Sequence, residues 1–472
     1  MFTSSIALKT TVKTLPADLY TPIGIYLRLR DRFPDTILLE SAGHHGQQNN
    51  FSYIALQPIA GIEVKNNKEA EIKFPLENPK KISLENQKLT HTLQAFSACF
   101  CPLAPDNPIA KSAQGLFGYI SYDAIPLFEN LRFKEPSEEN QIPLLRYRLY
   151  QYVIAINHFN DEMFLIENKI PGLPSILNEI ESILLQKNVS VFPFEPLGHE
   201  TSNLTDNAFE NLVETAKKHC FRGDVFQLVL SRRFEQKFKG DEFNVYRALR
   251  TINPSPYLFF FDYGEYKLIG SSPESQLVLR DRKAFIHPIA GTFVRTGHAE
   301  KDLQAAEALK NDPKENAEHT MLVDLARNDL SIHGQNTSVE KLKEIQFFSH
   351  VIHMVSEVST EVSAKQNPYE MIASTFPQGT LSGAPKYRAM QLIDQYEKSS
   401  RSFYGGTIGF VGFDGSCNLA IMIRTFLSKN QTLYYQAGAG IVAKSSATNE
   451  RQEVQNKLNA LKAAIKKAAS IV

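Results

Sequence analysis

GTIGFVG (406–412), CNLAIMIRTFL (417–427) and TLYYQAGAGIVA (432–443) are three largely apolar runs near the end of this chain. An Asp-Gly pair at 414–415 separates the first two, and Asp-Gly between apolar runs is a strong signal for a β-hairpin. A Lys-Asn pair at 429–430 predicts a second turn. We therefore expect a meander of three antiparallel strands.

Other parts of the chain add strands and helices to this meander. Apolar residues recur at helical spacing from Phe209 to Cys220, with Gly223 as a fitting C-cap, and again on one face of the last helix at Val454, Leu458, Leu461 and Ile465. Long antiparallel stretches interrupted by helices predict an α+β fold, with large antiparallel sheets packed together and flanked by helices. Further strands are expected at 36–40, 51–55, 150–157, 162–167, 225–231, 257–262, 267–270, 276–280 and 284–287.

The segment 187–206 carries prolines and polar residues between two helical patterns, which is typical of a domain boundary. We therefore predict an N-terminal domain over 1–190 and a second domain over 200–472. A chain of 472 residues is long enough for two large domains.

The composition excludes several classes of function. Lys+Arg and Asp+Glu are both 51, and a balanced charge argues against nucleic acid or an anionic membrane as the main partner. No apolar run approaches the length of a membrane span, and no signal peptide is indicated. The four cysteines have neither zinc-site spacing nor the density of a disulfide framework, so we expect a cytoplasmic protein with reduced thiols.

Two Glu-x-x-Glu pairs lie on two predicted helices. Glu315 and Glu318 belong to the first helix, and Glu450 and Glu453 to the second. Residues three apart share a helix face, so each helix can direct two carboxylates at one point. Two such faces brought together would hold a hard divalent cation, for which Mg²⁺ is the usual choice when a substrate carboxylate or phosphate completes the shell.

A simpler reading exists for each pair. Asp312-Pro313-Lys314-Glu315 has the form of a capping box with Pro at the first helical position. Glu453 can form an i,i+4 ion pair with Lys457. On spacing alone, solvated helix carboxylates are the favoured interpretation.

Segments spread over nearly the whole chain change that balance. They are LLES (38–41), GDVFQLVLSRRF (223–234), NPSPYLFFF (253–261), GSSPES (270–275), PIAGT (288–292), KENAEHTMLVDLARNDL (314–330), SHVIHMVSE (349–357), FPQGTLSGAPKYRAM (376–390), YGGTIGFVG (404–412), IRTF (423–426) and GAGIVA (438–443). By their number and order these segments resemble the chorismate-utilising enzymes, and in particular the anthranilate synthase component I family.

The resemblance implies an enzyme that makes anthranilate and pyruvate from chorismate and ammonia, with Mg²⁺ on the ring carboxylate. Glu318 and Glu453 match direct metal ligands, and Glu315 and Glu450 match ligands acting through water. Arg424 matches the residue that grips the pyruvyl carboxylate, a task suited to its bidentate fork. The other matching positions that line the site are Tyr404, Gly438, Ala439, Gly440, Thr380 and Lys457.

Two positions discriminate within the family. Gln227 stands where relatives that add water to chorismate carry a Lys base, and a neutral amide suits ammonia, which is already a nucleophile. Ala290 stands where aminodeoxychorismate synthases of the common type carry a Lys that forms a covalent intermediate. Both residues favour direct amination to anthranilate.

The resemblance also assigns the proton chemistry. Glu274 would act as general acid when the C4 hydroxyl leaves, and His353 would serve the elimination of pyruvate. His319 is as readily explained by helix packing as by catalysis.

Partners and regulation follow from the same resemblance. No cysteine has the context of a glutaminase nucleophile, so we expect a separate glutamine amidotransferase subunit in a hetero-oligomer, supplying ammonia. LLES and NPSPY match segments that bind tryptophan as feedback inhibitor. The predicted inhibitor residues are Glu40, Ser41, Asn253, Pro254, Ser255, Pro256 and Tyr257.

Two alternatives remain open at this stage. One is another chorismate enzyme, an aminodeoxychorismate or aminodeoxyisochorismate synthase, against which Ala290 and His353 speak. The other is a catalytically dead regulatory subunit that binds tryptophan, which the intact acidic positions argue against.

Overall fold

The computed structural model of the chain describes residues 2, 5–41, 50–85, 87–134, 140–186, 188–347 and 351–471. The described residues up to 186 form β1 (Ile6–Pro16), α1 (Pro22–Leu29), β2 (Ile37–Glu40), β3 (Phe51–Val64), β4 (Glu69–Lys73), β5 (Lys80–Ser83), α2 (Leu89–Ser97), β6 (Phe100–Pro102), the 3-10 segment η1 (Pro108–Ala113), β7 (Gly115–Ile120), the 3-10 segment η2 (Tyr122–Leu127), β8 (Leu145–Asn157), β9 (Glu162–Lys169) and α3 (Leu177–Leu184).

The remaining elements follow from residue 194 onward. They are β10 (Phe194–Ser202), α4 (Asp206–Arg222), β11 (Gln227–Gly240), α5 (Phe243–Ile252), β12 (Tyr257–Asp262), β13 (Tyr266–Ser272), β14 (Ser275–Arg280), β15 (Lys283–Ile286), β16 (Ile289–Val294), α6 (Ala299–Asn311), α7 (Pro313–Ser331), β17 (Gln335–Phe347), β18 (Val351–Glu361), α8 (Pro368–Thr375), α9 (Gly379–Ser382), β19 (Gly383–Ala384), α10 (Lys386–Tyr396), β20 (Thr407–Gly412), β21 (Cys417–Ile421), β22 (Thr425–Lys429), β23 (Thr432–Ile441) and α11 (Ala447–Ala468).

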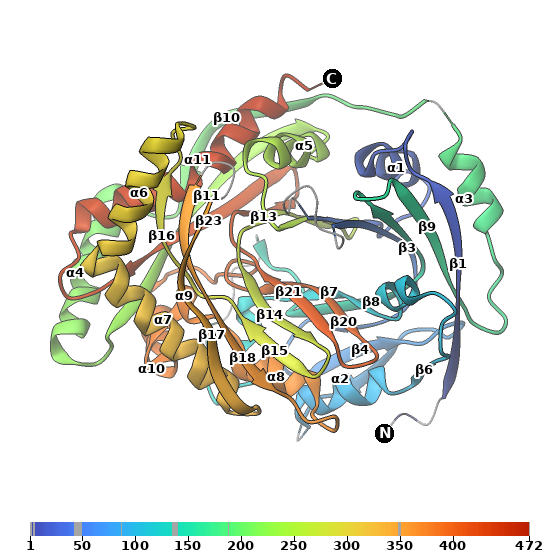
Figure 1. The fold of residues 1–472 in the computed structure, drawn as a ribbon, viewed down its shortest axis with the longest axis horizontal. Coiled ribbons are helices and arrows are strands. Elements are labelled where there is room, and N and C mark those ends of the chain that lie inside the picture. Colours follow the sequence, from blue (N-terminus) through green and yellow to red (C-terminus); the bar gives the residue numbers. More distant parts are fainter. Residues whose placement is uncertain are drawn as a thin grey trace.

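Two series of antiparallel strands extend from the paired strands β3 and β8. One series runs β3–β2–β12–β13–β22–β23–β11–β10. The other runs β8–β7–β20–β21–β14–β15–β18, and β18 also pairs with β16 and β17. In Figure 1 the two series form facing layers, with α5 and α11 outside one layer and α2 and α8 outside the other. The predicted α+β fold with packed antiparallel sheets is confirmed.

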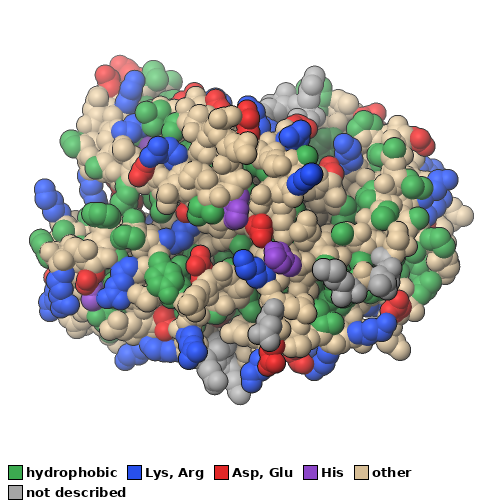
Figure 2. All heavy atoms as spheres, turned by 90° about the horizontal axis from the view of Figure 1, so that it is seen from below, with side chains coloured by type: hydrophobic (Ala, Val, Ile, Leu, Met, Phe, Trp, Pro, Cys, Tyr) green, Lys and Arg blue, Asp and Glu red, His purple; other side chains and the backbone are tan. Residues whose placement is uncertain are grey.

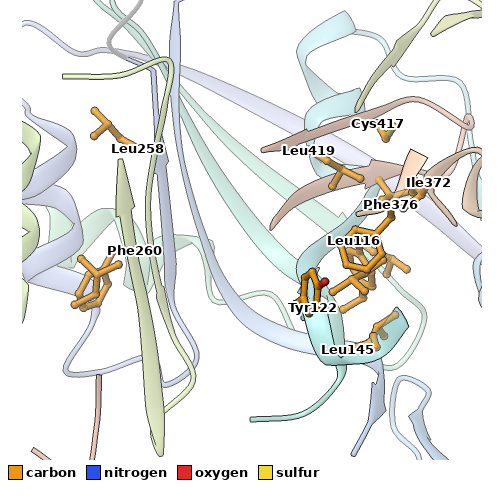
Figure 3. Close-up of a cluster of buried hydrophobic side chains, with 14 of the residues drawn as sticks. Leu116, Tyr122, Leu145, Leu258, Phe260, Ile372, Phe376, Cys417 and Leu419 are labelled. Atoms are coloured by element: carbon orange, nitrogen blue, oxygen red, sulfur yellow. The ribbon is translucent and has the colours of Figure 1, made fainter. Parts of the chain in front are cut away.

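Apolar side chains cover both faces of the layers. One cluster, with Phe259 and Phe261 of β12 and Phe117 of β7, lies between the layers, and a larger one packs their outer faces against the flanking helices. Figure 3 shows part of the larger cluster: Leu258 and Phe260 point away from the facing layer, Phe260 lies against the ring of Phe243 on α5, and a second group lies around α8. Burying a large apolar side chain stabilises a fold by about 1.5–3 kcal/mol, so the inner cluster is a main source of the layers' association and the outer one holds the helices on the layers. The second group labelled in the figure consists of Leu116, Tyr122, Leu145, Ile372, Phe376, Cys417 and Leu419.

The predicted meander is present, with two corrections. The expected strand at 417–427 is broken into β21 and β22, because Arg424 adopts the left-handed conformation with φ 48°. That conformation costs a non-glycine residue roughly 1–2 kcal/mol, which a sequence pattern does not reveal. The second turn lies one residue later than expected, at Asn430 and Gln431, whose positive φ values of 50° and 54° are typical of a type I′ hairpin.

The predicted helices are confirmed, and the expected boundary segment contains an additional strand. Gly223 ends α4 in the left-handed conformation with φ 81°. The predicted apolar face of α11, including Val454 and Leu458, is buried. Strand β10 lies inside the polar segment 187–206, where its hydrogen bonds to β11, more than its composition, make it a strand.

Strands from the two predicted domains pair with each other. In the pairs β2–β12 and β7–β20, one strand precedes residue 190 and the other follows residue 200. The division into 1–190 and 200–472 stays a prediction. Of the helices in the described parts of the chain, none is long and apolar enough to cross a membrane.

Candidate active site

Helix α7 brings the first acidic pair to the site through the predicted cap. The Asp312 side chain accepts hydrogen bonds from the backbone N–H groups of Lys314 (2.8 Å) and Glu315 (3.0 Å), and Pro313 is the first helical residue. The N-cap of the predicted capping box is therefore confirmed, although the Asp312 N–H donates to the Leu309 carbonyl and not to Glu315. This N-cap fixes where the helix starts, and so places Glu315 and Glu318 in its first two turns.

His319 anchors α7 to the sheet. Its side chain is fully buried, and its Nε2 lies 2.6 Å from the Ser356 hydroxyl on β18. Burial lowers the pKa of His319 to about 4, so the ring is neutral. This geometry supports the packing role for His319.

The carboxylates of the two helices act on one another electrostatically. Burial raises the pKa of Glu318, and the negative charge of Glu453 on α11 raises it further. Burial also raises the pKa of Glu315, and the charge of Glu318 raises it further. In the same way, burial and the charge of Glu453 raise the pKa of Glu450. The two predicted acidic pairs therefore lie within electrostatic range of one another.

These residues fit a hard divalent cation in their chemistry, although they are not gathered around one point. Among the residues that the structure describes, no three His, Cys, Asp or Glu side chains lie close enough to hold one metal ion. The Lys457 ammonium lies 2.7 Å from Glu453, which is the predicted i,i+4 pair. Mg²⁺ would relieve the repulsion between these carboxylates. The metal site therefore stays a prediction, which the chemistry of its oxygen donors supports.

Gln227 and the glycines of β23 form the adjoining wall. The Gln227 amide Nε2 donates to Glu318 Oε1 at 3.2 Å. A Cβ on Gly440 would lie 2.5 Å from that nitrogen, and a Cβ on Gly438 would lie 3.1 Å from the Tyr404 hydroxyl. Glycine at both positions therefore leaves room for the side chains of the site. The methyl group of Ala439 belongs to the apolar core, so its backbone is what can face the site.

Lys457 extends along this wall. Its Nζ donates to the Gly438 carbonyl at 2.9 Å as well as pairing with Glu453. Burial alone would lower the pKa of Lys457, but Glu453 and the neighbouring Tyr404 and Glu318 outweigh this and raise it. Lys457 therefore carries its positive charge beside Tyr404, as the predicted substrate side of the site requires.

Glu274 and Thr380 form the acid end of the site. Glu274 is 8% exposed, and the Thr380 hydroxyl donates to its Oε1 at 3.3 Å. Burial raises the pKa of Glu274 to about 8, although the Thr380 hydroxyl and two nearby cations act to lower it. The carboxyl group is consequently protonated at neutral pH, which is the state that a general acid needs.

Arg424 and His353 complete the set. Burial lowers the pKa of Arg424, while the nearby Glu274 acts in the opposite direction. His353 Nδ1 lies 2.9 Å from the Gly291 carbonyl, which can only accept, so Nδ1 carries the proton. Burial lowers the pKa of His353, and Arg424 lowers it further. His353 is therefore a neutral imidazole whose Nε2 is the unprotonated nitrogen.

The predicted inhibitor segments also meet. Strand β2 pairs with β12 so that Glu40 lies opposite Leu258, directly after residues 253–257. Glu40 Oε1 accepts from the Tyr246 hydroxyl (2.6 Å) and from Arg250 Nε (2.8 Å), both on α5. Residues 42–49 after LLES, and residues 349 and 350 of SHVIHMVSE, lie outside the described residues.

Sequence reasoning missed a buried ion pair behind the site. Glu397 pairs with Arg401 Nη2 at 2.7 Å and accepts from the backbone N–H of Ser231, which lies opposite Gly438. Arg401 also donates to the Leu381 carbonyl beside Thr380 at 2.6 Å. The signal available in the sequence was the spacing of four residues between Glu397 and Arg401.

Charged side chains elsewhere are mixed in sign. On the face shown in Figure 2, Lys and Arg side chains are interspersed with Asp and Glu. A cavity of about 550 Å³ lies on the far side of Arg401, lined among others by Tyr122 and Asp123, and shares none of the predicted site residues.

Comparisons with known proteins identify the family of this chain. The family model described as chorismate binding enzyme matches residues 35–463. Anthranilate synthase component 1 of Aquifex aeolicus is 35% identical over 96% of this chain and 93% of the relative, and that of Neisseria meningitidis serogroup C is 37% identical over 95% and 93%. The crystal structure of anthranilate synthase component I from Streptococcus pneumoniae superposes with a TM-score of 0.77 at 31% identity, covering 95% of this chain and 99% of that one. This chain belongs to the chorismate binding enzyme family.

Proposed function

We propose that this chain is the large, aminating subunit of an anthranilate synthase, which converts chorismate and ammonia into anthranilate, pyruvate and water. The observation that carries the proposal is Gln227, a neutral amide hydrogen-bonded to Glu318 at the centre of the site. An amide cannot deprotonate water, but ammonia needs no such help. The names of the curated relatives support the same activity.

In this proposal Glu318 and Glu453 hold Mg²⁺, with Glu315 and Glu450 behind them. The ion would neutralise the ring carboxylate of chorismate and stabilise negative charge during the reaction. The raised pKa values of Glu315, Glu318 and Glu450, whose main cause is burial, support a cluster that a cation would relieve.

The chain's own residues then account for two steps. In the first, ammonia adds at ring C2 and the C4 hydroxyl leaves as water with the proton of Glu274. Arg424 holds the pyruvyl carboxylate during this step. In the second step the bond between the ring and the enolpyruvyl oxygen breaks and the ring becomes aromatic. The unprotonated Nε2 of His353 takes up the proton that the ring loses, and a proton passes to the departing enolpyruvate to give pyruvate.

We further propose that a glutamine amidotransferase subunit supplies the ammonia in a hetero-oligomer. The described cysteines Cys99, Cys101, Cys220 and Cys417 are free thiols, and burial raises the pKa of Cys99, Cys220 and Cys417, the opposite of an activated nucleophile. Free thiols also suit the cytoplasmic location expected from the sequence.

Feedback by tryptophan is proposed for the place where β2 meets β12. The predicted residues there are Glu40, Ser41 and 253–257, and Glu40 is tied to helix α5. A ligand between β2 and α5 could act on the catalytic half through that helix. Inhibition of turnover by tryptophan that is lost in Glu40→Gln would support this assignment, whereas unchanged inhibition would refute it.

The test of the proposed activity is product identification. The purified chain is incubated with chorismate, Mg²⁺ and ammonium, and products are separated by chromatography. Anthranilate supports the proposal. An aminodeoxychorismate product would refute it, and Ala290 argues against that outcome. Intact chorismate with or without the partner would favour a catalytically dead subunit.

A further inference from the structure

The side chain of Asn253 lies against the proposed substrate arginine. Arg424 Nη1 donates to Asn253 Oδ1 at 3.3 Å. Within the described residues this is the one hydrogen bond that the Arg424 side chain makes. A guanidinium group has five N–H donors, so most of its hydrogen-bonding capacity is left for a ligand.

A network around Asn253 fixes the orientation of its amide. Nδ2 donates to the Ser271 hydroxyl (3.1 Å), to the Ser271 carbonyl (3.3 Å) and to the Ser255 hydroxyl (3.2 Å). The Ser271 hydroxyl in turn donates to the Asn253 carbonyl. Because the NH₂ group is committed to these serines, the carbonyl oxygen Oδ1 must face Arg424.

The backbone on both sides of this contact is also held. The N–H of Asn253 donates to the Leu249 carbonyl at the end of α5, and the N–H of Ser271 donates to the Arg424 carbonyl at 3.2 Å. Arg424 itself has the strained φ of 48°, which persists only where surrounding contacts hold it. Asn253 and Ser271 together supply such contacts to one residue's side chain and backbone.

We propose that Asn253 is a positioning residue for catalysis, which aims the Arg424 guanidinium at the substrate carboxylate. This proposal rests on the proposed function and deepens it, because it moves Asn253 from the predicted inhibitor contacts to the substrate side. The amide is suited to this role since it is a neutral acceptor. The amide orients the guanidinium group of Arg424 without neutralising its charge, whereas a carboxylate would form an ion pair with Arg424 and compete with the substrate.

This reasoning predicts that Asn253→Asp impairs chorismate binding more than Asn253→Ala does. Asn253→Asp keeps the size of the side chain but should raise KM for chorismate on the order of 10- to 100-fold, with a smaller change in kcat. Asn253→Ala removes the acceptor without adding a charge, and should raise KM only a few-fold. If Asn253 only supported the fold, the loss of its Nδ2 donors would lower the melting temperature of Asn253→Asp without this selective rise in KM for chorismate.

Asn244→Asp is the matched control. Asn244 lies on the same helix α5, and its Oδ1 accepts from Arg247 Nη1 at 3.0 Å, but it belongs to no part of the site. The same amide-to-acid change beside an arginine should leave KM for chorismate within about twofold of the wild type. Melting temperatures of all variants show whether each is folded at the assay temperature.

Chorismate affinity is measured by calorimetry in the presence of Mg²⁺, and turnover is measured in parallel. The two measurements separate a failure of the proposed activity from a failure of the role given to Asn253. A wild-type chain that binds chorismate without forming anthranilate removes the proposed activity but not this inference. An Asn253→Asp enzyme that binds chorismate as tightly as the wild type, or a control whose affinity falls equally, overturns this inference alone.

Discussion

Replacing Glu274 by glutamine should inactivate the enzyme and stabilise it at alkaline pH at the same time. Burial raises the pKa of Glu274 from 4.5 to about 8. The fold therefore disfavours the ionised carboxylate. Below pH 4.5 the group is protonated in the folded and unfolded states and costs nothing. As the pH rises from 4.5 to 8, only the unfolded state loses the proton, so the free energy of unfolding falls.

The size of this effect follows from the shift. A difference of about 3.5 pKa units at 1.36 kcal/mol each gives an upper limit of about 5 kcal/mol above pH 8. Glutamine cannot ionise, so the folded state of the variant does not lose this stability as the pH rises. Glu274→Gln should therefore match the wild type in stability near pH 4.5 and exceed it by up to several kcal/mol near pH 9, while kcat falls by about 10²–10⁴-fold.

Denaturant unfolding at pH 5, 7 and 9 measures the stability, and anthranilate fluorescence measures kcat. Glu77→Gln, which removes an exposed carboxyl group outside the site, is the control and should show no such growing difference. The wild-type kcat should also decline as the pH passes about 8, because the acid is then ionised. Stability curves that run parallel for Glu274→Gln and the wild type, or a variant that retains full turnover, would refute the reasoning.

Three other substitutions test the remaining roles. Arg424→Lys keeps the charge but loses the fork, so KM for chorismate should rise about tenfold or more; an unchanged KM would exclude Arg424 as the carboxylate anchor. Glu453→Gln should raise the Mg²⁺ concentration needed for half-maximal activity on the order of tenfold, measured by titration after EDTA treatment, and an unaltered titration would remove Glu453 from the metal site. His353→Ala should consume chorismate while anthranilate formation drops about 10²-fold or more, so that an aminated intermediate appears by chromatography; full anthranilate yield would contradict its role.

The fold and the site were accessible from the sequence to different degrees. Alternating apolar runs and the Asp-Gly turn predicted the antiparallel meander, because strand period and hairpin chemistry are local properties. The break at Arg424 was not predictable, since its left-handed φ is imposed by contacts with Ser271 and Asn253, which lie more than 150 residues earlier in the chain.

The same distinction explains the site. Spacing alone could pair Glu315 with Glu318, and the resemblance to a family could name their partners on α11. Neither could show that Asn253, grouped with the inhibitor segment, has its amide on Arg424. The Glu397–Arg401 ion pair behind Tyr404 was likewise missed, because a buried charge is recognised only when its partner is known.

The most direct test of the central claim is anthranilate fluorescence from the purified chain with chorismate, Mg²⁺ and excess ammonium at alkaline pH. The chain contains no tryptophan whose emission would interfere. The account predicts a signal that grows with time, stops when EDTA is added and resumes with excess Mg²⁺. A flat signal while chorismate is consumed, or a signal that EDTA does not affect, would contradict it.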